Sequence, residues 1–270
     1  MDPSRVSQFA NWEVGDRPMT KYYVFFPAYN EHKAIERVLR ETDKLFNENG
    51  LSPLELVVVD DGSLDNTVEI VKNLQSSLPI TLLQHKHNKG LGAALNTGLI
   101  HIIKKANNED VIVTTESDGC QDTSKLILLT KAVLDGADLA VATPLIGEGF
   151  KGVPLYRRFL SRGANILYGI LFPIKGLDDY TNLNRAFLAK VLKKGLQNYG
   201  EDKFIDRVGF EAVPDIILKI RDQKPFVKEV PIVIDFSNAE RHSSMDVLKT
   251  ILNSLILCWD HLVTIKHREK

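Results

Sequence analysis

The sequence has few cysteines and no long uncharged apolar run, and both absences restrict what the protein can be. Cys120 and Cys258 lie far apart and match no spacing typical of a zinc site or a redox pair, so we expect two thiols in a reducing compartment such as the cytoplasm. No window of about 18 residues is free of charge, so no membrane-spanning helix is expected. Residues 1–20 lack the basic start and apolar run of a signal peptide, which predicts a non-secreted chain.

An excess of charge of either sign is also missing. The 34 Lys and Arg residues against 35 Asp and Glu residues give a net charge of −1, so no overall field attracts nucleic acid, and nucleic acid is not expected as a partner. The 270 residues, 44% of them hydrophobic, can fill a sizeable core. We expect one domain over residues 1–270, with its core at about 20–245 and a last helix at about 245–266.

Segments typical of strands and of helices alternate along the first half of the chain. Apolar runs that indicate strands buried on both faces lie at 22–26, 54–59, 80–83, 111–115 and 139–142. Apolar residues at helical spacing lie between them, at 31–46, 66–74, 91–105 and 124–134. This order predicts an α/β fold with a mostly parallel, Rossmann-like sheet flanked by helices, and ligands of such sheets bind beyond the carboxyl ends of the strands.

The regular alternation stops after residue 142. Residues 143–153 contain three glycines and predict a mobile loop, and a helix pattern follows over 154–172. A helix near 210–221 and a strand at 226–234 are expected further on.

The last helix is predicted to be amphipathic, because apolar residues within 247–265 recur at steps of three and four. Two placements remain open for it. Packing on the body of the protein is favoured, while lying on a membrane surface is kept open by the basic residues of 266–270.

Acidic residues follow three of the predicted strands. The strand ends read Pro27-Ala28-Tyr29-Asn30-Glu31, Asp60-Asp61-Gly62-Ser63 and Glu116-Ser117-Asp118-Gly119. Carboxylates gathered at one edge repel unless they are solvated, hydrogen-bonded or neutralised by a cation. Oxygen ligands without a His or Cys cluster suit Mg²⁺ or Mn²⁺, which take their remaining ligands from water and phosphate oxygens. These strand ends therefore predict a divalent cation and a phosphorylated ligand.

Glu116 and Asp118 are the candidate metal ligands. Alternate residues of an extended stretch point the same way, so both can face one ion while Ser117 turns away. Acid-x-acid triplets also occur by chance as solvated loop residues, but the position after an apolar strand favours a function. Asp60 and Asp61 are good turn and cap residues as well, so one can cap while the other accepts from a base or ribose.

A glycine-rich segment, residues 88–94, follows the third predicted strand and leads into a helix. Such a loop could cradle phosphate. It lacks the third glycine of the dinucleotide fingerprint and does not follow the first strand, so a nicotinamide-dependent reductase is remote.

Together these four motifs, in this order and spacing, resemble the family 2 glycosyltransferases of the GT-A fold. The later segments 161–165 and 179–187 look like the branch that contains the dolichyl-phosphate mannosyltransferases and related polyprenyl-phosphate sugar transferases. The resemblance implies a metal-dependent, inverting transfer of a hexose from a GDP- or UDP-linked sugar, with Mg²⁺ or Mn²⁺ as the cofactor. The acceptor that it implies is a polyprenyl phosphate such as dolichyl phosphate.

The resemblance also implies roles for individual residues. The nucleotide pocket is assigned to Pro27, Ala28, Tyr29, Glu31, Asp60, Asp61 and Lys89. The metal ligands that it implies are Glu116, Asp118 and Gln121. The candidate catalytic residues are Asp118, Asp179 and Arg162, the last two because of the chemistry of the acceptor. Three positions depart from the family pattern: Glu116 replaces the usual Asp, 182–184 replace a Ser-Gly pair, and 241–245 is a changed form of an Arg, Gly, Ser, Lys motif.

Four arginines are candidates for binding the acceptor phosphate. Arg158 and Arg162 lie four apart on a predicted helix, and Arg185 and Arg241 could converge on the same region. Guanidinium groups suit phosphate because they offer a planar fork of donors, although helix arginines also pair with local acids. A sugar hydroxyl as acceptor would need a base instead, for which Asp179 is the candidate; its alternative is a cap or an arginine partner.

Several alternatives stay open. The chain can be a nucleotide-sugar-binding regulatory protein on a decayed transferase fold, or a transferase to a soluble hydroxyl acceptor. A sugar nucleotidyltransferase would need a glycine- and arginine-rich loop after the first strand, which 27–31 is not. For a lipid acceptor, we expect work at the cytosolic membrane face, through the last helix or a membrane-anchoring partner.

Overall fold

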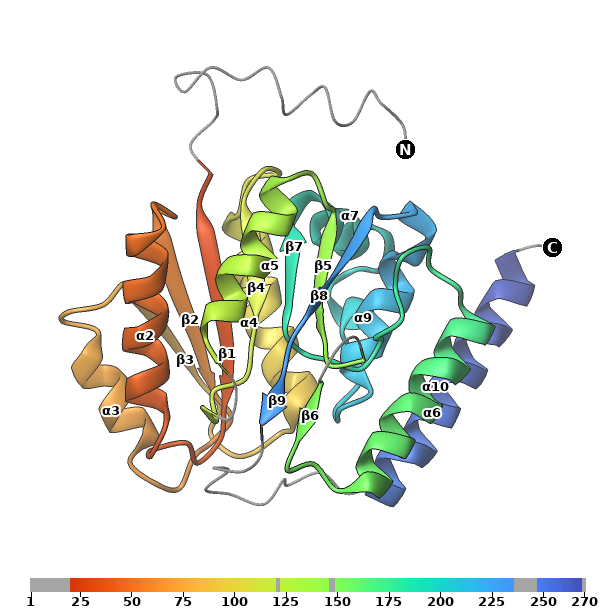
Figure 1. Ribbon diagram of the computed structural model, residues 1–270, viewed down its shortest axis with the longest axis horizontal. Coiled ribbons are helices and arrows are strands. Elements are labelled where there is room, and N and C mark those ends of the chain that lie inside the picture. Colours follow the sequence, from red (N-terminus) through yellow and green to blue (C-terminus); the bar gives the residue numbers. More distant parts are fainter. Residues whose placement is uncertain (1–19, 120–121, 146–148, 236–246, 269–270) are drawn as a thin grey trace.

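The computed structural model describes residues 20–119, 122–145, 149–235 and 247–268, and a seven-stranded sheet forms its centre (Figure 1). In spatial order the strands are β3 (Ile80–Gln84), β2 (Leu54–Asp60), β1 (Tyr22–Ala28), β4 (Val111–Thr114), β7 (Arg185–Leu188), β5 (Leu139–Thr143) and β8 (Val227–Pro231). β7 is antiparallel to both neighbours, and the other pairs are parallel. Two short strands, β6 (Phe150–Lys151) and β9 (Ile234–Asp235), pair with each other.

Helices cover both faces of the sheet, because successive side chains of each strand point to opposite sides. Along β1, Val24 and Phe26 pack toward α2 (Ile35–Glu48), α3 (Thr67–Leu74) and α5 (Ser124–Leu134). Tyr23 and Phe25 pack toward α4 (Leu91–Lys105), α7 (Ala189–Tyr199) and α9 (Ala212–Ile220). The predicted α/β fold with a mostly parallel sheet is confirmed.

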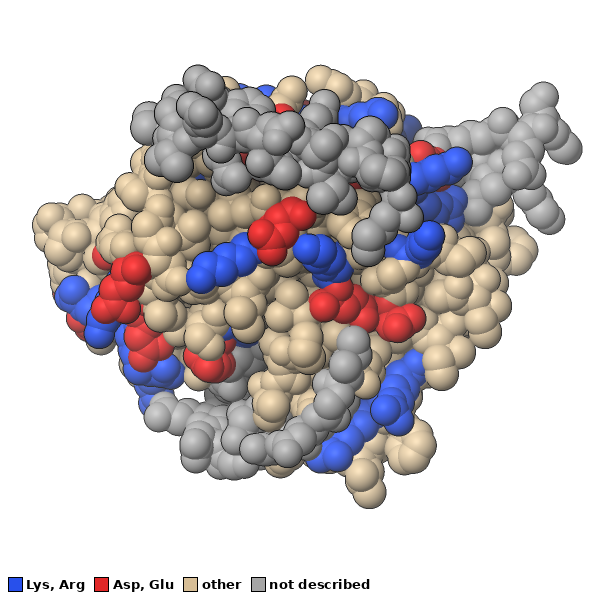
Figure 2. Space-filling model, turned by 45° about the horizontal axis from the view of Figure 1, so that its top comes forward, with Lys and Arg blue, Asp and Glu red and all other residues tan. Residues whose placement is uncertain are grey.

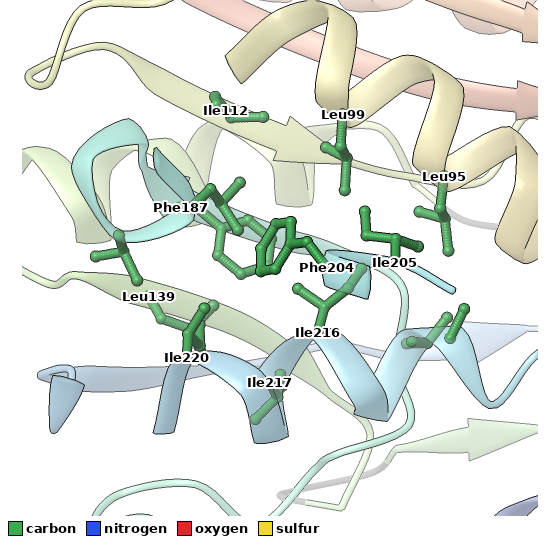
Figure 3. Packing of buried hydrophobic residues seen from close by; sticks show 14 of the residues in the cluster. Leu95, Leu99, Ile112, Leu139, Phe187, Phe204, Ile205, Ile216, Ile217 and Ile220 are labelled. Atoms are coloured by element: carbon green, nitrogen blue, oxygen red, sulfur yellow. The ribbon is translucent and has the colours of Figure 1, made fainter. Parts of the chain in front are cut away.

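The hydrophobic cluster on the α4, α7 and α9 side of the sheet extends to the loops that precede α9. Phe204, at the end of the short helix α8 (Glu201–Phe204), lies between Phe187 of β7 and Ile216 of α9, and Ile205 points toward α4 (Figure 3). The 3-10 turn Arg221–Gln223 follows α9. The core therefore fixes the chain on both sides of residue 205.

Strand β7 is the element of the sheet that the sequence did not predict. Its first residue, Arg185, ends a stretch that reads as polar. The four residues form a strand because they fit between β4 and β5, with Thr114 opposite Arg185 and Leu139 opposite Phe187. Helices α7 and α8 were also missed. By contrast, α4 and α5 have the predicted bounds, and β6 lies inside the predicted loop 143–153.

Two helices stand beside the sheet rather than on it. α6 (Leu155–Leu171) and α10 (Val247–Arg268) contact each other and begin at the end of the molecule where β1, β2 and β4 finish (Figure 1). Leu257, Cys258 and His261 of α10 are buried, so this helix packs on the body, as favoured. No helix within the described ranges has both the length and the apolarity of a membrane span.

Buried Cys258 is a free thiol, as expected, and Cys120 lies outside the described residues. On the face that Figure 2 shows, acidic and basic side chains are interspersed over a largely uncharged surface, in keeping with the balanced charge of the chain.

Candidate nucleotide and metal site

The carboxyl ends of β1, β2 and β4 lie side by side and carry the predicted motifs. Ala28 is opposite Asp60 in the sheet, and the amide of Asp61 donates to the carbonyl of Ala28 at 2.8 Å. On the other side of β1, the hydroxyl of Ser117 donates to the carbonyl of Pro27 at 2.7 Å. Parallel pairing therefore brings together three segments that are far apart in the sequence.

Glu116 and Asp118 both line a small hollow beside this edge, while Ser117 is buried against β1. The alternation expected for an extended segment is thus observed. The hollow is also lined by Val38, Thr115, Gly119, Thr123 and Lys125. Lys125, the second residue of α5, was not predicted as a site residue. Its position seven residues after Asp118 is the sequence feature that indicated it.

The donor set of this hollow fits a hard divalent cation. Two carboxylates, from Glu116 and Asp118, are the number of protein ligands that Mg²⁺ and Mn²⁺ commonly take, with water and phosphate oxygens at the other positions. Within the described part of the chain, no group of three or more His, Cys, Asp and Glu side chains is placed to hold a metal by itself. Gln121, the third predicted ligand, lies outside the described residues.

Asp60 shapes the turn that ends β2. Its carboxylate accepts from the amides of Gly62 at 3.2 Å and Ser63 at 3.1 Å. Gly62 has a φ of +73°, and a Cβ there would lie 2.5 Å from the backbone of His87. Glycine is therefore required at this point.

Asp61, which is 4% exposed, directly follows β2 and contacts the end of β1, the residue after β3 and the glycine-rich loop. One carboxylate oxygen accepts from the amide of Lys89 at 2.9 Å and contacts Nδ1 of His85 at 2.6 Å. The other accepts from the amide of Gly90 at 2.8 Å. Nε2 of His85 is held in turn by the hydroxyl of Thr97 at 2.8 Å. His85 and Thr97 were not predicted, because nothing local marks a histidine that pairs 24 residues away.

Three backbone amides of the glycine-rich loop, which the sequence suggested as a phosphate cradle, are bonded within the protein. The amides of Lys89 and Gly90 bind Asp61, and the amide of Gly92 donates to the carbonyl of Val208 at 2.7 Å. The side chain of Lys89 is exposed at the edge of the site. Internal hydrogen bonds occupy these backbone donors, so a phosphate here would be bound through the Lys89 side chain and not through these amides.

The segment after β1 is fixed by the segment after β2. Asn30, at a φ of +58°, donates its amide to the hydroxyl of Ser63 at 2.8 Å, and the amide of Glu31 donates to the hydroxyl of Thr67 at 2.8 Å. These bonds leave Pro27, Tyr29 and Glu31 half-buried at the edge, with Ala28 buried.

On the acceptor side, Asp179 is buried and organises the loop before β7. Its Oδ1 accepts from the amides of Thr181 at 3.0 Å and Asn182 at 3.1 Å, and from Nδ2 of Asn165 on α6 at 3.3 Å. This is the cap-like alternative to the predicted base, and it ties the loop to α6.

Arg185 was predicted to converge on an acceptor phosphate, and the structure buries it instead. It is 2% exposed, and its guanidinium donates to the carbonyls of Val213 and Tyr180, each at 2.6 Å. Burial lowers the pKa of Arg185, and the nearby Asp179 carboxylate works in the opposite direction. The position inside the sheet, set by β7, was hidden from the sequence.

Arg158 and Arg162 remain on α6, one turn apart on the face that also carries Asn165. Arg158 is half-buried and donates from Nε to the carbonyl of Val153 at 3.0 Å, whereas Arg162 is exposed. Arg241 lies outside the described residues.

The chain belongs to glycosyl transferase family 2, whose model matches residues 23–196. The matched range begins in β1 and ends in α7, so it contains the three strand ends and the hollow. This makes the protein a glycosyltransferase.

Relatives with named activities transfer sugars to lipid phosphates. The chain is 29% identical over 213 residues to a dolichol-phosphate mannosyltransferase of Pyrococcus furiosus. This alignment covers 78% of this chain and 55% of the relative. It is 26% identical over 227 residues to a UDP-N-acetylglucosamine–dolichyl-phosphate N-acetylglucosaminyltransferase of Methanococcus voltae, covering 78% and 84%.

Solved structures share the fold at low identity. Glucosyl-3-phosphoglycerate synthase from Mycobacterium tuberculosis, in complex with Mn²⁺, UDP and phosphoglyceric acid, aligns with a TM-score of 0.61 at 17% identity, over 88% of this chain and 78% of that one. This likeness supports the GT-A-like architecture.

Proposed function

We propose that the protein transfers a hexose from a UDP- or GDP-linked sugar to a polyprenyl phosphate, with inversion at the anomeric carbon. The observation that carries the proposal is the single edge at which β1, β2 and β4 present Pro27–Glu31, Asp60–Asp61 and Glu116–Asp118. Membership of family 2 and the lipid-phosphate acceptors in the names of two relatives support the same reaction.

The donor lies along this edge in our proposal. The nucleoside contacts Pro27, Ala28, Tyr29 and Glu31, and Lys89 lies near the phosphates. Asp60 and Asp61 act mainly by holding the pocket's loops, since their carboxylates already bind protein groups.

Glu116 and Asp118 would hold the divalent cation, together with Gln121. When bound, the cation would neutralise the negative charge that develops on the departing nucleoside diphosphate. The Mn²⁺ named with the structural neighbour supports this cofactor.

The acceptor phosphate would approach from α6, where Arg162 is exposed and Arg158 is half-buried. A phosphate monoester is already ionised near neutral pH, so it needs cations to position it more than a base to deprotonate it. Its oxygen forms the new bond to the anomeric carbon as the bond to the nucleoside diphosphate breaks, and the electron pair leaves with the diphosphate. The burial and cap-like bonds of Asp179 support a positioning role for this residue.

We propose that α6 and α10 place the site at the cytosolic face of a membrane. Their outward sides carry large apolar side chains that the protein leaves exposed, which we call the helix-pair face: Leu155, Tyr156, Phe159, Leu160, Ile166, Ile170, Ile251, Leu252, Leu255, Ile256, Trp259 and Val263. Apolar helix faces with exposed Trp and Tyr and nearby basic residues suit the boundary between headgroups and acyl chains. Both helices begin at the same end of the molecule as the donor edge, the edge formed by Pro27–Glu31, Asp60–Asp61 and Glu116–Asp118 (Figure 1).

The first experiment is calorimetric titration with UDP and with GDP, each with and without Mn²⁺, followed by transfer from the matching nucleotide sugars to a short polyprenyl phosphate. We expect Mn²⁺-dependent binding of one nucleotide and transfer that Arg162→Gln weakens through the acceptor KM. Binding of neither nucleotide by folded protein would contradict the proposal and favour a decayed fold.

A further inference from the structure

We propose that Arg207 is a positioning residue for donor binding, because it links α10 to the loop that holds Asp61. The link runs through residues 205–209, which we call the connecting segment. This inference rests on the donor site proposed above, and it adds a residue that lies on neither the donor edge nor the helix-pair face.

The connecting segment lies directly against the glycine-rich loop. The amide of Gly92 donates to the carbonyl of Val208 at 2.7 Å. A Cβ at Gly92 would lie 1.8 Å from the carbonyl oxygen of Arg207, and one at Gly90 would lie 2.6 Å from the carbonyl oxygen of Val208. Interiors this closely packed transmit small shifts, so a movement of the segment must move the loop.

The same loop supplies the bonds that orient Asp61. The amide of Lys89 binds one carboxylate oxygen at 2.9 Å, and the amide of Gly90 binds the other at 2.8 Å. Asp61 also joins β1 through its own amide, which donates to Ala28. A shift of the glycine loop therefore reaches the backbone of the proposed nucleotide pocket in two hydrogen-bonded steps.

The opposite side of the segment is tied to α10. Nη2 of Arg207 donates to Oδ2 of Asp260 at 2.7 Å, with the arginine side chain 24% exposed. Burial alone would lower the pKa of Arg207, but the bond from Asp260 and the nearby carboxylates of Asp215 and Asp206 outweigh it and raise that pKa. The next residue of α10, His261, contacts Asp215 of α9 at 2.8 Å.

Other contacts fix the start of the segment without involving α10. Nδ2 of Asn96 on α4 donates to the carbonyl of Ile205 at 2.6 Å, and Nζ of Lys219 on α9 contacts Asp206 at 2.8 Å. Ile205 points toward Leu95 and Leu99 in the core (Figure 3). With one end anchored in this way, the ion pair between Arg207 and Asp260 directly links α10 to the part of the segment that touches Gly92.

The test compares four single variants, and the double variant Arg207→Gln with Asp260→Asn, by calorimetric titration with UDP and GDP in Mn²⁺ and by thermal unfolding. Arg207→Gln and Asp260→Asn each remove the ion pair, and Arg207→Lys keeps its charge. Glu201→Gln is the matched control, because it removes an ion pair of the same length, 2.7 Å to Lys104, from the short helix just before the segment.

We expect Arg207→Gln and Asp260→Asn to weaken nucleotide binding about five- to tenfold. Arg207→Lys should recover most of the loss, the double variant should be no weaker than either single one, and Glu201→Gln should bind like the unchanged protein. In transfer assays the loss should fall on the donor KM and not on kcat.

Unchanged nucleotide binding in Arg207→Gln and Asp260→Asn would overturn the inference. Equal losses in all four variants that follow the melting temperature would also overturn it, since they would reflect stability alone. Absence of binding in the unchanged protein would instead remove the donor site itself. Failure of the Arg207 inference is therefore seen in the variants, and failure of the proposed donor site is seen in the unchanged protein.

Discussion

At the donor edge, polar side chains are buried and hydrogen-bonded within the protein, whereas on the helix-pair face apolar side chains are left exposed to solvent. At the donor edge, Asp60 and Asp61 are buried, and both carboxylates accept backbone amides. On the helix-pair face, Phe159 is 74% exposed and Trp259 is 69% exposed. A polar edge closed by internal bonds keeps its shape without a ligand, whereas exposed apolar patches mark surfaces that meet another molecule or a membrane. The comparison assigns rigidity to the donor side and contact to the helix pair.

The largest effect is expected at the donor edge, from Asp118→Asn. The variant removes one of two carboxylates that line the hollow, so we expect Mn²⁺-stimulated transfer to fall at least about 100-fold with little change in thermal stability. Initial rates at a series of Mn²⁺ concentrations measure it.

Asp122→Asn is the control for this change. Asp122 is exposed in the same loop, and its carboxylate binds Ser124 at the start of α5. Equal losses in the two variants would show that the loop matters only as a whole and would remove Asp118 from the metal site.

An intermediate effect is expected on the helix-pair face, from Leu255→Ser. Leu255 is 52% exposed on α10, and burying a leucine in lipid is worth about 2 kcal/mol, so partitioning onto vesicles should weaken about tenfold or more. Co-sedimentation with vesicles of mixed neutral and anionic lipids measures it, while nucleotide affinity should stay unchanged.

Leu128→Ser provides a matched control, because Leu128 is 51% exposed on α5, away from this face. It should leave vesicle binding as it is. If both serine variants bind vesicles like the unchanged protein, the face does not meet lipid.

The smallest effect is expected from Glu55→Gln, on the free energy of unfolding. Glu55 lies at the start of β2, at the opposite end of this strand from Asp60. Burial would raise the pKa of Glu55, but hydrogen bonds from Lys105, Lys21 and Thr81 outweigh it and lower that pKa to about 2. Because the folded value lies below the ordinary 4.5, the stabilisation is present above about pH 4.5 and is lost as pH falls toward 2. We expect a cost of about 1–2 kcal/mol at pH 7 that shrinks at pH 3, in urea unfolding.

Glu36→Gln, which breaks the exposed pair with Arg40, should cost less than about 0.5 kcal/mol at both pH values. A cost for Glu55→Gln that is the same at pH 7 and pH 3 would disprove the linkage. Nucleotide affinity at pH 7 should be unchanged in both variants, which separates stability from the shape of the donor edge.

Much of the donor side could be predicted from the sequence because its signals are local. Apolar runs, helical spacing and a change to acidic residues at three strand ends lie within a few neighbouring residues. Parallel pairing then brings these ends together without further information. The bounds predicted for α4 and α5 are confirmed for the same reason.

The acceptor side was harder because its contacts join distant parts of the chain. Arg185 reads as a surface cation and becomes buried once β7 inserts between β4 and β5. Asp179 reads either as a base or as a cap or arginine partner, and in the structure it accepts bonds from its own loop and from Asn165 on α6. Neither outcome has a signal within a few residues in the sequence.

By itself, the sequence determined the alternation of strands and helices, the order of the strand-end motifs and the amphipathic character of the last helix, since each depends on side chains close together along the chain. The tertiary structure decided which carboxylates are already bonded, which arginine is buried, and that α6 and α10 lie against each other, each with large apolar side chains left exposed. It also decided that Arg207 lies between α10 and the glycine loop. These features depend on packing between segments that lie up to 118 residues apart, the separation of Gly90 and Val208, and local spacing carries no information about such contacts.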